Sequence, residues 1–586
     1  MNLIVAVFAV IWALFSPCFG PSGRCAGAFA QTGGQEASKS EVRVINNVPR
    51  LFINGKELNT GAVNVYYLPD MGIETKNKNE VPRYGQAQWL INTKVLIDQA
   101  VNNGARLILL NLWWSDLDRS EVRPKNIADN LDFGQLDEIF DHAREKNAYI
   151  IPFFVFFPFV PDWWLKENNF PPYHKDKVCS HCETDSYGNV YNNASMNADI
   201  VQRDWGAFLQ AVVNRYRKHA ALAGWFAGVG TTGEDGYGPN YIVLKGFGNA
   251  CEKIEPKPLM FTDYSPYFKE KFKEWLKEKY RDDPGLQDAW NDKAVTFARF
   301  MIPKPSEMIR EGQQVPMFPD PTDIFAEAGG HSDEGKLTEK GKDFYEFRNE
   351  MRRQDRRYYS DLIKKADPNH VLIFSAVSDE AMNQDSLAEG FAFSLANTND
   401  SEADSLFYYL AIDIVRRAVE KGKLAFITRE HGCDGRSFSS TGKCEQPQQL
   451  RFMDLLGKSV KCAGGIFAYA AAPYNKGSYT NGSWFPPVWF SSEAMSVAKS
   501  INDYSPAEGC ISSSISEAFE CNGCNSKMPA LNCRLLNKIY KAYFNKEFAP
   551  LNIDNGPGSP GKCGDGICDE FEKQCGKCPQ DCVSEK

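Results

Sequence analysis

Residues 131–156 of the chain, LDFGQLDEIFDHAREKNAYIIPFFVF, hold an amphipathic stretch that leads directly into an apolar run. The periodicity over residues 133–146 predicts a surface helix. The run Ala148–Phe156 is short, apolar and rich in aromatic and β-branched residues, which predicts a buried strand. A helix that returns the chain to a buried strand is the repeating unit of a parallel sheet.

The same alternation recurs along most of the chain. Eight runs predict strands, in chain order Ala62–Tyr67, Arg106–Leu112, Ala148–Phe156, Gly224–Val229, His370–Ser375, Phe391–Ala396, Leu424–Thr428 and Gly465–Tyr469. Amphipathic helices are predicted over residues 88–103, 133–146, 197–218, 264–280, 344–366, 406–421 and 448–462. Eight strand–helix units within residues 42–505 predict an α/β fold, a (β/α)8 TIM barrel with enlarged loops. An open doubly wound sheet shares the alternation, but no predicted strand is followed by the Gly-rich phosphate loop of such folds.

Two segments are longer than barrel connections require. Residues 157–196 follow the third strand, and loops that follow strands line the active face of a barrel. We therefore expect this segment to form a wall of a cleft. Residues 281–342 are rich in Pro, Asp and Gly and follow a predicted helix, so only their size suggests a lid.

The N-terminus predicts export. The apolar run LIVAVFAVIWALF (residues 3–15) is followed by small residues, so we expect a signal peptide over 1–30, cut after Ala30 or else after Gly20. No Lys or Arg precedes the run, which leaves an uncleaved anchor as the alternative. Residues 31–41 are polar and small and are expected to be a linker. The mature protein is then secreted or held at the cell surface, and no other segment is expected to cross a membrane.

Cysteines gather at the C-terminal end, since twelve of the seventeen follow Glu430. Residues 506–550 predict a cysteine-containing extension packed on the barrel, and residues 555–586 a linker and a cysteine-rich tail. Disulfides are favoured in an exported chain. The Cys179-X-X-Cys182 and Cys521-X-X-Cys524 spacings also suit structural Zn²⁺, and acids in the tail suit structural Ca²⁺. No cofactor is expected for the chemistry.

Composition bounds the partners. The net charge is −9 and no basic stripe or arginine-rich arm is present, which argues against a nucleic-acid partner. Aromatic residues make up 13% of the chain, an excess that suits stacking on sugar rings, although most must fill the core. A carbohydrate substrate is therefore the expected partner, and the oligomeric state is left open.

Two glutamates follow predicted strands. Glu234 lies in GTTGEDGYG (230–238) after the fourth strand, and Glu430 lies in ITREHGCDG (427–435) after the seventh. Barrel enzymes place catalytic groups at the C-terminal ends of strands. Two carboxylates that face each other across a barrel mouth are what glycoside hydrolysis requires. The alternative is that each is a solvated surface acid.

Other polar and aromatic residues near strand ends are candidates for substrate binding. They are Trp113, Trp114, Asp116, Trp163, Asp235, Tyr237, Asn397, Tyr474 and Trp484. Because neighbours on a strand face opposite ways, one of the adjacent Trp113 and Trp114 is expected to be in the core.

Several stretches resemble one enzyme family. LDFGQLDEIFDHAREKNAYIIPFF (131–154), PDWWLKENN (161–169), FKEWLKEKYRDDPGLQDAW (272–290), FYEFRNEM (344–351) and DPNHVLIFS (367–375) are similar to glycoside hydrolase family 42, the β-galactosidases. That family belongs to a clan of barrel glycosidases whose acid/base ends strand four and whose nucleophile ends strand seven. The resemblance implies a retaining hydrolase with Glu234 as acid/base and Glu430 as nucleophile, their carboxyl groups roughly 5–5.5 Å apart.

One position departs from the clan's pattern. The clan has Asn immediately before the acid/base, where it contacts the sugar 2-hydroxyl, whereas this chain has Gly233. Another group then binds that hydroxyl, or the substrate lacks it, or the chain belongs to another family. A family 5-like enzyme, an inverting β-amylase-like enzyme and a non-catalytic sugar-binding barrel are the alternatives.

Overall fold

The computed structural model describes part of the 586-residue chain. The described residues are 37–58, 60–65, 86–118, 120–155, 160–170, 179–184, 186, 188, 190–195, 197–227, 263–308, 310, 337–375, 387–395, 411, 414–415, 417–430, 447–471 and 492–504. The chain divides into two compact units, Met1–Ala37 and Ser38–Lys586, and every element below belongs to the second. The expected signal peptide, the extension 506–550 and the tail 555–586 lie outside the described residues.

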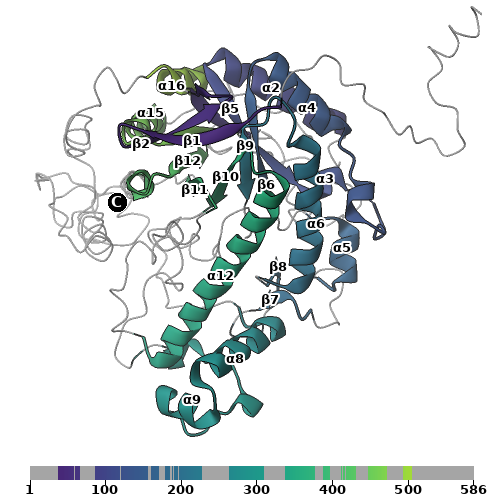
Figure 1. Ribbon diagram of the computed structural model, residues 1–586, viewed down its shortest axis with the longest axis vertical. Helices are drawn as coiled ribbons and strands as arrows, with labels where there is room; N and C mark the ends of the chain where they lie inside the picture. Colours follow the sequence, from purple (N-terminus) through teal and green to yellow (C-terminus); the bar gives the residue numbers. More distant parts are fainter. Residues whose placement is uncertain are drawn as a thin grey trace, which may run out of the picture. The chain divides into compact units, whose positions relative to one another are not determined.

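Eight parallel strands close into a barrel in which neighbours in space are neighbours in the chain (Figure 1). They are β4 (Gly61–Val65), β5 (Ala105–Trp113), β6 (Tyr149–Val155), β9 (Gly224–Ala227), β10 (Val371–Ser375), β11 (Gly390–Leu395), β12 (Leu424–Glu430) and β13 (Ile466–Ala471). Each coincides with a predicted strand, so the predicted (β/α)8 barrel is confirmed.

Helices return the chain between these strands. They include α2 (Gln86–Asn102), α4 (Gly134–Glu145), α6 (Asp199–Tyr216), α12 (Glu339–Ala366), α15 (Pro447–Cys462) and α16 (Ser492–Asp503). The helix α4 shows why they form, since Leu136, Ile139, Phe140 and Ala143 recur at helical spacing and are all buried. Asp132 Oδ1 accepts from Gly134 N at 3.0 Å where this helix begins. Within the described ranges, no helix is both long and apolar enough to span a membrane.

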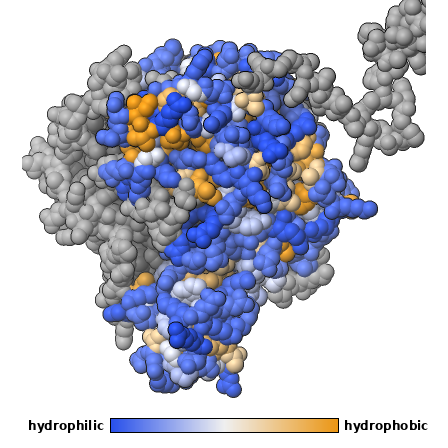
Figure 2. Space-filling model, viewed as in Figure 1, coloured by the Kyte–Doolittle hydropathy of each residue, from blue (hydrophilic) through white to orange (hydrophobic). Residues whose placement is uncertain are grey.

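A small antiparallel sheet precedes the barrel and was not predicted. It consists of β1 (Ser40–Ile45), β2 (Val48–Ile53) and β3 (Lys56–Glu57). The turn between β1 and β2 holds Asn46 and Asn47 at φ 51° and 63°, a left-handed pair that suits the twist of a hairpin. The expected linker 31–41 is therefore too long, since β1 already begins at Ser40. Hydrophobic residues gather over this hairpin (Figure 2), where Val44 is 54% exposed.

Polar contacts fasten this sheet to the N-terminal ends of barrel strands. Ser40 N donates to Asn369 O at 3.0 Å, and Ser40 Oγ accepts from Val371 N at 2.9 Å. The buried Ser38 hydroxyl lies 2.7 Å from Leu222 O and 3.0 Å from His370 Nε2. The sheet is thus bound to the barrel end where β9 and β10 begin.

A helical module lies between β9 and β10. It contains α8 (Pro266–Tyr280), α9 (Asp283–Trp290), η2 (Phe297–Arg299), α10 (Pro305–Met308) and the N-terminal half of α12. Its core is separate from the barrel core and includes Phe268, Phe272, Leu286, Phe344 and Phe347. The predicted helix over 264–280 therefore belongs to this module and not to the barrel wall. The suggested lid over 281–342 is, where described, part of the same module.

One buried carboxylate joins the helices of this module. Asp343 of α12 is 1% exposed and accepts from Lys279 Nζ at 2.9 Å, Tyr280 Oη at 2.9 Å and Trp290 Nε1 at 2.6 Å. Its donors come from α8 and α9, so a single side chain fixes both helices against α12. A buried carboxylate with three donors is stabilising because both of its oxygens accept hydrogen bonds.

Candidate active site

Strand registers show which residues face the barrel lumen. Directly paired residues of neighbouring strands share a face, and faces alternate along each strand. The ring of Phe154 lies 6.4 Å from that of Trp205 in α6, so Phe154 faces the helices. Phe153 therefore faces the lumen, where its ring stacks on that of Phe226 at 3.9 Å.

The registers carry this assignment around the barrel. Phe153 pairs with Asn111 of β5. Asn64 of β4 pairs with Leu109, two residues before Asn111, so both asparagines hold lumen-facing positions. On the other side Asn64 pairs with Ala470, and Ala470 pairs with Glu430. Asn64, Ala470 and Glu430 thus form one row across three adjacent strands at their C-terminal ends.

Below this row the lumen is filled mainly by apolar side chains, with the buried Thr428 of β12 as a polar member. The buried, lumen-facing residues there include Ala62, Leu109, Ile151, Phe226, Ile373, Phe426 and Ala468. Packed side chains of this kind make the interior of a (β/α)8 barrel a core rather than a pore. A ligand therefore reaches the barrel only at the C-terminal end.

Two asparagines mark the change from apolar floor to polar mouth. Asn64 is 3% exposed and Asn111 is 1% exposed. Among the described residues, neither Asn64 Oδ1 nor the two amide atoms of Asn111 has a hydrogen-bond partner. They were missed in the sequence, although each interrupts an apolar strand, as AVNV (62–65) and LLNL (109–112).

The predicted catalytic pair is described in part. Glu430 is the last residue of β12, which confirms its expected place at the end of the seventh barrel strand. Glu234 follows β9 but lies outside the described residues, as do Asp235, Tyr237, Asn397, Tyr474 and Trp484. Their roles, and the distance between the two carboxyl groups, stay predictions.

Trp114 and Trp163 are not substrate-binding residues. They are 0% and 1% exposed, and their rings meet edge to face at 5.7 Å. Trp114 also stacks on Phe208 of α6 at 5.7 Å, which places both tryptophans in the layer between strands and helices. Trp163 Nε1 donates to the buried Asp118 Oδ2 at 3.1 Å. Both rings are packing residues, so the substrate-binding prediction for them is wrong, while the expectation that one of the adjacent Trp113 and Trp114 lies in the core is confirmed.

The neighbouring candidates have a different placement. Trp113 is 1% exposed and ends β5 on the same face as Asn111, two residues on. Asp116 is half-buried in the short helix α3 (Trp114–Leu117). A contact of either residue with substrate stays a prediction.

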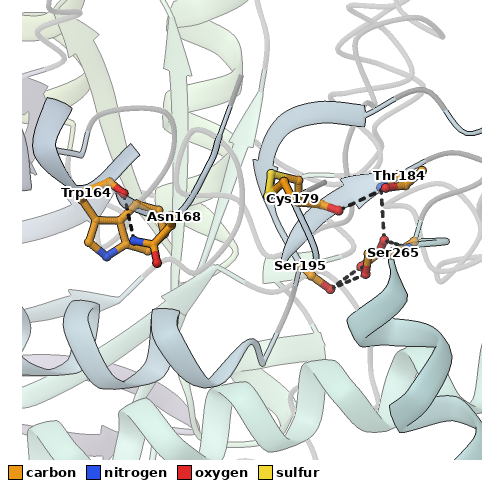
Figure 3. The surroundings of a disulfide bond; sticks show 8 residues. Trp164, Asn168, Cys179, Thr184, Ser195 and Ser265 are labelled. Carbon is orange, nitrogen blue, oxygen red and sulfur yellow. Dashed lines mark hydrogen bonds between the residues drawn. A yellow bond between two sulfur atoms is a disulfide. The ribbon is translucent and has the colours of Figure 1, made fainter. Parts of the chain in front are cut away.

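The segment after the third barrel strand forms a hairpin beside the helical module. It holds α5 (Asp162–Glu167) and the strands β7 (Cys182–Thr184) and β8 (Val190–Ala194), which pair with each other. Cys179 and Cys182 form a disulfide, which confirms the preference for a disulfide over zinc at this pair (Figure 3). Elsewhere, no cluster of three or more His, Cys, Asp or Glu side chains suited to a metal occurs in the described ranges.

Asp263 joins this hairpin to the module. It is fully buried and accepts from Thr184 N at 3.2 Å, from Ser265 N at 2.7 Å and from the Ser195 hydroxyl (Figure 3 shows Thr184, Ser195 and Ser265). Burial raises the pKa of Asp263, although these donors favour its carboxylate form. The connections that follow strands β6 and β9 are thereby fixed together on one side of the barrel mouth.

A second polar cluster lies at the opposite end of the barrel. Ser38, His370 and Asp367 form a hydrogen-bonded chain, with His370 Nδ1 2.7 Å from Asp367 Oδ2. Trp225 Nε1 also donates to Asp367 Oδ2 at 2.8 Å. The order of groups resembles a serine hydrolase triad, but all three are at most 3% exposed and lie where strands begin. They lie at the end of the barrel opposite the mouth, and the chain of bonds holds the N-terminal sheet.

The fold and the site define a (β/α)8-barrel protein with a closed apolar floor and a polar C-terminal mouth. No protein-family model and no curated protein matches the chain. Among solved structures, the catalytic domain of a β-amylase from Paenibacillus polymyxa matches with 12% identity and a TM-score of 0.47, over 76% of this chain and 99% of that one.

Two further solved structures match this chain with comparable sequence identities and TM-scores. A β-galactosidase from the psychrophilic Marinomonas ef1 matches with 13% identity and a TM-score of 0.44, over 75% of this chain and 59% of that one. A glycoside hydrolase family 5 mannosidase from Rhizomucor miehei matches with 10% identity and a TM-score of 0.40, over 79% and 96%. The barrel assignment rests on the strand registers of this chain.

Proposed function

We propose that this protein is a retaining glycoside hydrolase, similar to the β-galactosidases, that cleaves a glycosidic bond in an oligo- or polysaccharide. The observation that supports it is the place of Glu430, which ends the seventh strand of a closed barrel in a lumen-facing row with Ala470 and Asn64. Catalytic groups of barrel enzymes occupy this end of the strands.

In this proposal the reaction is a double displacement. The Glu430 carboxylate attacks the anomeric carbon while the Glu234 carboxylic acid gives its proton to the departing glycosidic oxygen. Glu234, now a carboxylate, then takes a proton from water, and the resulting hydroxide oxygen displaces Glu430 from the anomeric carbon. Two inversions restore the starting configuration, and both glutamates end in their starting forms.

The test is turnover of a panel of nitrophenyl glycosides. We expect the wild-type protein to release nitrophenol from at least one of them with retained configuration in the first sugar product, as read by NMR. We expect the Glu430→Gly variant to lose turnover and the Glu234→Gln variant to lose roughly 100- to 10,000-fold in kcat.

Azide separates the two roles. An azide ion that fits the space left in the Glu430→Gly variant forms a glycosyl azide of inverted configuration, because it attacks where the nucleophile did. In a Glu234→Gly variant azide attacks the glycosyl-enzyme and gives the retained product. Inverted sugar from the wild-type protein contradicts the retaining mechanism and favours a β-amylase-like enzyme.

A non-catalytic sugar-binding barrel is the second candidate, because Gly233 stands where the clan has its sugar-binding Asn. It predicts that the wild-type protein binds sugars in calorimetry without releasing nitrophenol from any glycoside. Normal turnover by the wild-type protein that survives in Glu430→Gly contradicts the role of Glu430 under either candidate.

We also propose that residues 1–30 are removed and that the mature protein is secreted or retained at the cell surface. The apolar run over 3–15 and the small residues up to Ala30 support this. N-terminal sequencing of the mature protein, and fractionation of cells that express the chain with and without residues 555–586, test it. An intact N-terminus in a cytosolic fraction contradicts it.

A further inference from the structure

Asn64 and Asn111 place unsatisfied amides inside the barrel. They lie on adjacent strands, in lumen-facing positions, and each is at least 97% buried. Asn64 Oδ1 and both amide atoms of Asn111 have no hydrogen-bond partner among the described residues. Buried polar groups are nearly always paired, so such groups point to a partner that binds from outside the chain.

Elsewhere this chain does pair a buried asparagine. Asn197, 6% exposed, donates through Nδ2 to Met351 O and accepts through Oδ1 from Gln202 Nε2 at 2.7 Å. The same residue type is therefore satisfied where it has a structural role. Asn64 and Asn111 differ from Asn197 in lacking such partners among the described residues.

Their position connects them to Glu430. Asn64 and Glu430 flank Ala470 in one register row, so their backbones lie two strand spacings apart, about 10 Å. Ala470 is the one register position between them in that row. A sugar ring that meets Glu430 at its anomeric carbon therefore lies within reach of an amide on β4 or β5.

We propose that Asn64 and Asn111 bind hydroxyl groups of the sugar ring whose anomeric carbon Glu430 attacks. An amide suits this task because its oxygen accepts from one hydroxyl and its nitrogen donates to another. It carries no charge and does not titrate, so it leaves the proton balance of the two glutamates unchanged. The two residues supply the amide that the chain lacks at Gly233. This inference rests on the proposed hydrolase function and names the groups that hold its substrate.

The test uses the full-length variants Asn64→Leu and Asn111→Leu, with Asn197→Leu as the matched control. Leucine has nearly the shape of asparagine without its hydrogen-bonding groups. On the best nitrophenyl glycoside, we expect kcat/KM to fall about 10- to 100-fold for each lumen variant. We expect their melting temperatures to stay unchanged or rise. The control loses satisfied bonds, so its melting temperature falls while kcat/KM of the folded enzyme holds.

Monodeoxy glycosides identify the hydroxyl that each amide contacts. The wild-type enzyme should lose activity on the analogue that lacks the contacted hydroxyl, and the matching Leu variant should show no further loss on it. Additive losses on every monodeoxy analogue, or lumen variants with wild-type kcat/KM, overturn the inference. An Asn111→Leu variant that melts below the wild type with unchanged kinetics shows a structural role instead.

The outcome separates this inference from the hydrolase proposal. Wild-type turnover that depends on Glu430 but not on either asparagine leaves the hydrolase standing and overturns the inference. If no glycoside is cleaved, calorimetric binding of the parent sugars to the wild-type protein and the Leu variants tests the asparagine contacts without turnover. If the wild-type protein binds sugar and the Leu variants do not, the asparagine contacts are supported and the hydrolase proposal is contradicted. If the wild-type protein binds no sugar, both proposals are contradicted.

Discussion

The two ends of the barrel differ in the hydrogen bonding of their buried polar groups. At the N-terminal end, Ser38, His370 and Asp367 satisfy one another. At the C-terminal end, Asn64 and Asn111 are as deeply buried and carry amide atoms without a partner among the described residues. Burial alone therefore does not separate structure from function in this fold. The two ends differ in whether these polar groups find partners, and the proposed sugar contacts of Asn64 and Asn111 rest on that difference together with their place in the lumen.

The largest effect on stability is expected from Asp367→Ala. This change leaves His370 and Trp225 Nε1 buried without their acceptor, and breaking a buried pair costs about 3–5 kcal/mol of unfolding free energy. Urea unfolding followed by circular dichroism measures the loss. Turnover per folded molecule should be unchanged. A loss of kcat without a loss of folded protein would contradict a purely structural role for the cluster at the N-terminal end.

Acidification should reduce the free energy of unfolding through Asp367, at the N-terminal end of the barrel. Burial raises the pKa of Asp367, but hydrogen bonding and charge from His370, with the bond from Trp225, outweigh it and set the pKa below its usual range. A carboxyl whose pKa is lower in the folded state stabilises the fold above its unfolded pKa of about 3.9. That contribution is lost as pH falls through the lowered value.

Melting temperatures between pH 6 and pH 2 test this point with Asp367→Asn as the comparison. The wild-type protein should lose more stability across the acid range than the variant does, because only its carboxylate is protonated there. Asp263 has the opposite sign, since burial raises its pKa. Parallel curves for the wild type and Asp367→Asn would refute the assigned shift.

A smaller effect is expected at the hairpin beside the barrel mouth. The Cys179–Cys182 disulfide closes a very short loop, so its loss in a Cys179→Ser/Cys182→Ser double variant should cost roughly 2 kcal/mol. We expect hydrogen exchange to increase in β7 and β8 first, and KM to rise more than kcat falls. Loss of stability spread evenly over the barrel strands would contradict a local role.

The smallest effect has the opposite sign. Asn111→Leu removes amide atoms that have no hydrogen-bond partner among the described residues, so the unfolding free energy should rise by about 1 kcal/mol. Denaturant titration at constant m-value measures it. A loss above about 1 kcal/mol would show that Asn111 is already satisfied, and the contrast between the two ends would fail.

The barrel could be predicted because its strands are short, apolar and separated by amphipathic helices. The N-terminal sheet was missed because no amphipathic helix separates its strands and charged residues interrupt them, as in SEVRVI (40–45), although the pair Asn46-Asn47 between apolar alternations signals a hairpin. The fold can therefore be predicted where apolar strands and amphipathic helices alternate repeatedly along the chain.

The site was harder to predict for a physical reason. Strand alternation predicts opposite faces for Trp113 and Trp114, and the structure agrees, with Trp113 on the face of Asn111 and Trp114 against α6; the sequence alone did not say which of the two faces the helices. Asn64 and Asn111 come close only because of the register between β4 and β5, and that register cannot be predicted from either strand alone. The place of Glu430 at the end of β12 was predictable, because it depends only on the strand, and its role as nucleophile stays a proposal.

The length of α12 has a consequence of its own. Its 28 residues span about 42 Å, and its two halves belong to different cores, with Phe344 and Phe347 in the module and Tyr359 and Ile363 in the barrel (Figure 1). A single continuous helix thus sets both the height and the facing of the module above the strands. Inserting one residue near its middle would turn the module by about 100° and lift it about 1.5 Å. Natural variation in this one helix would therefore remodel access to the mouth without altering a strand.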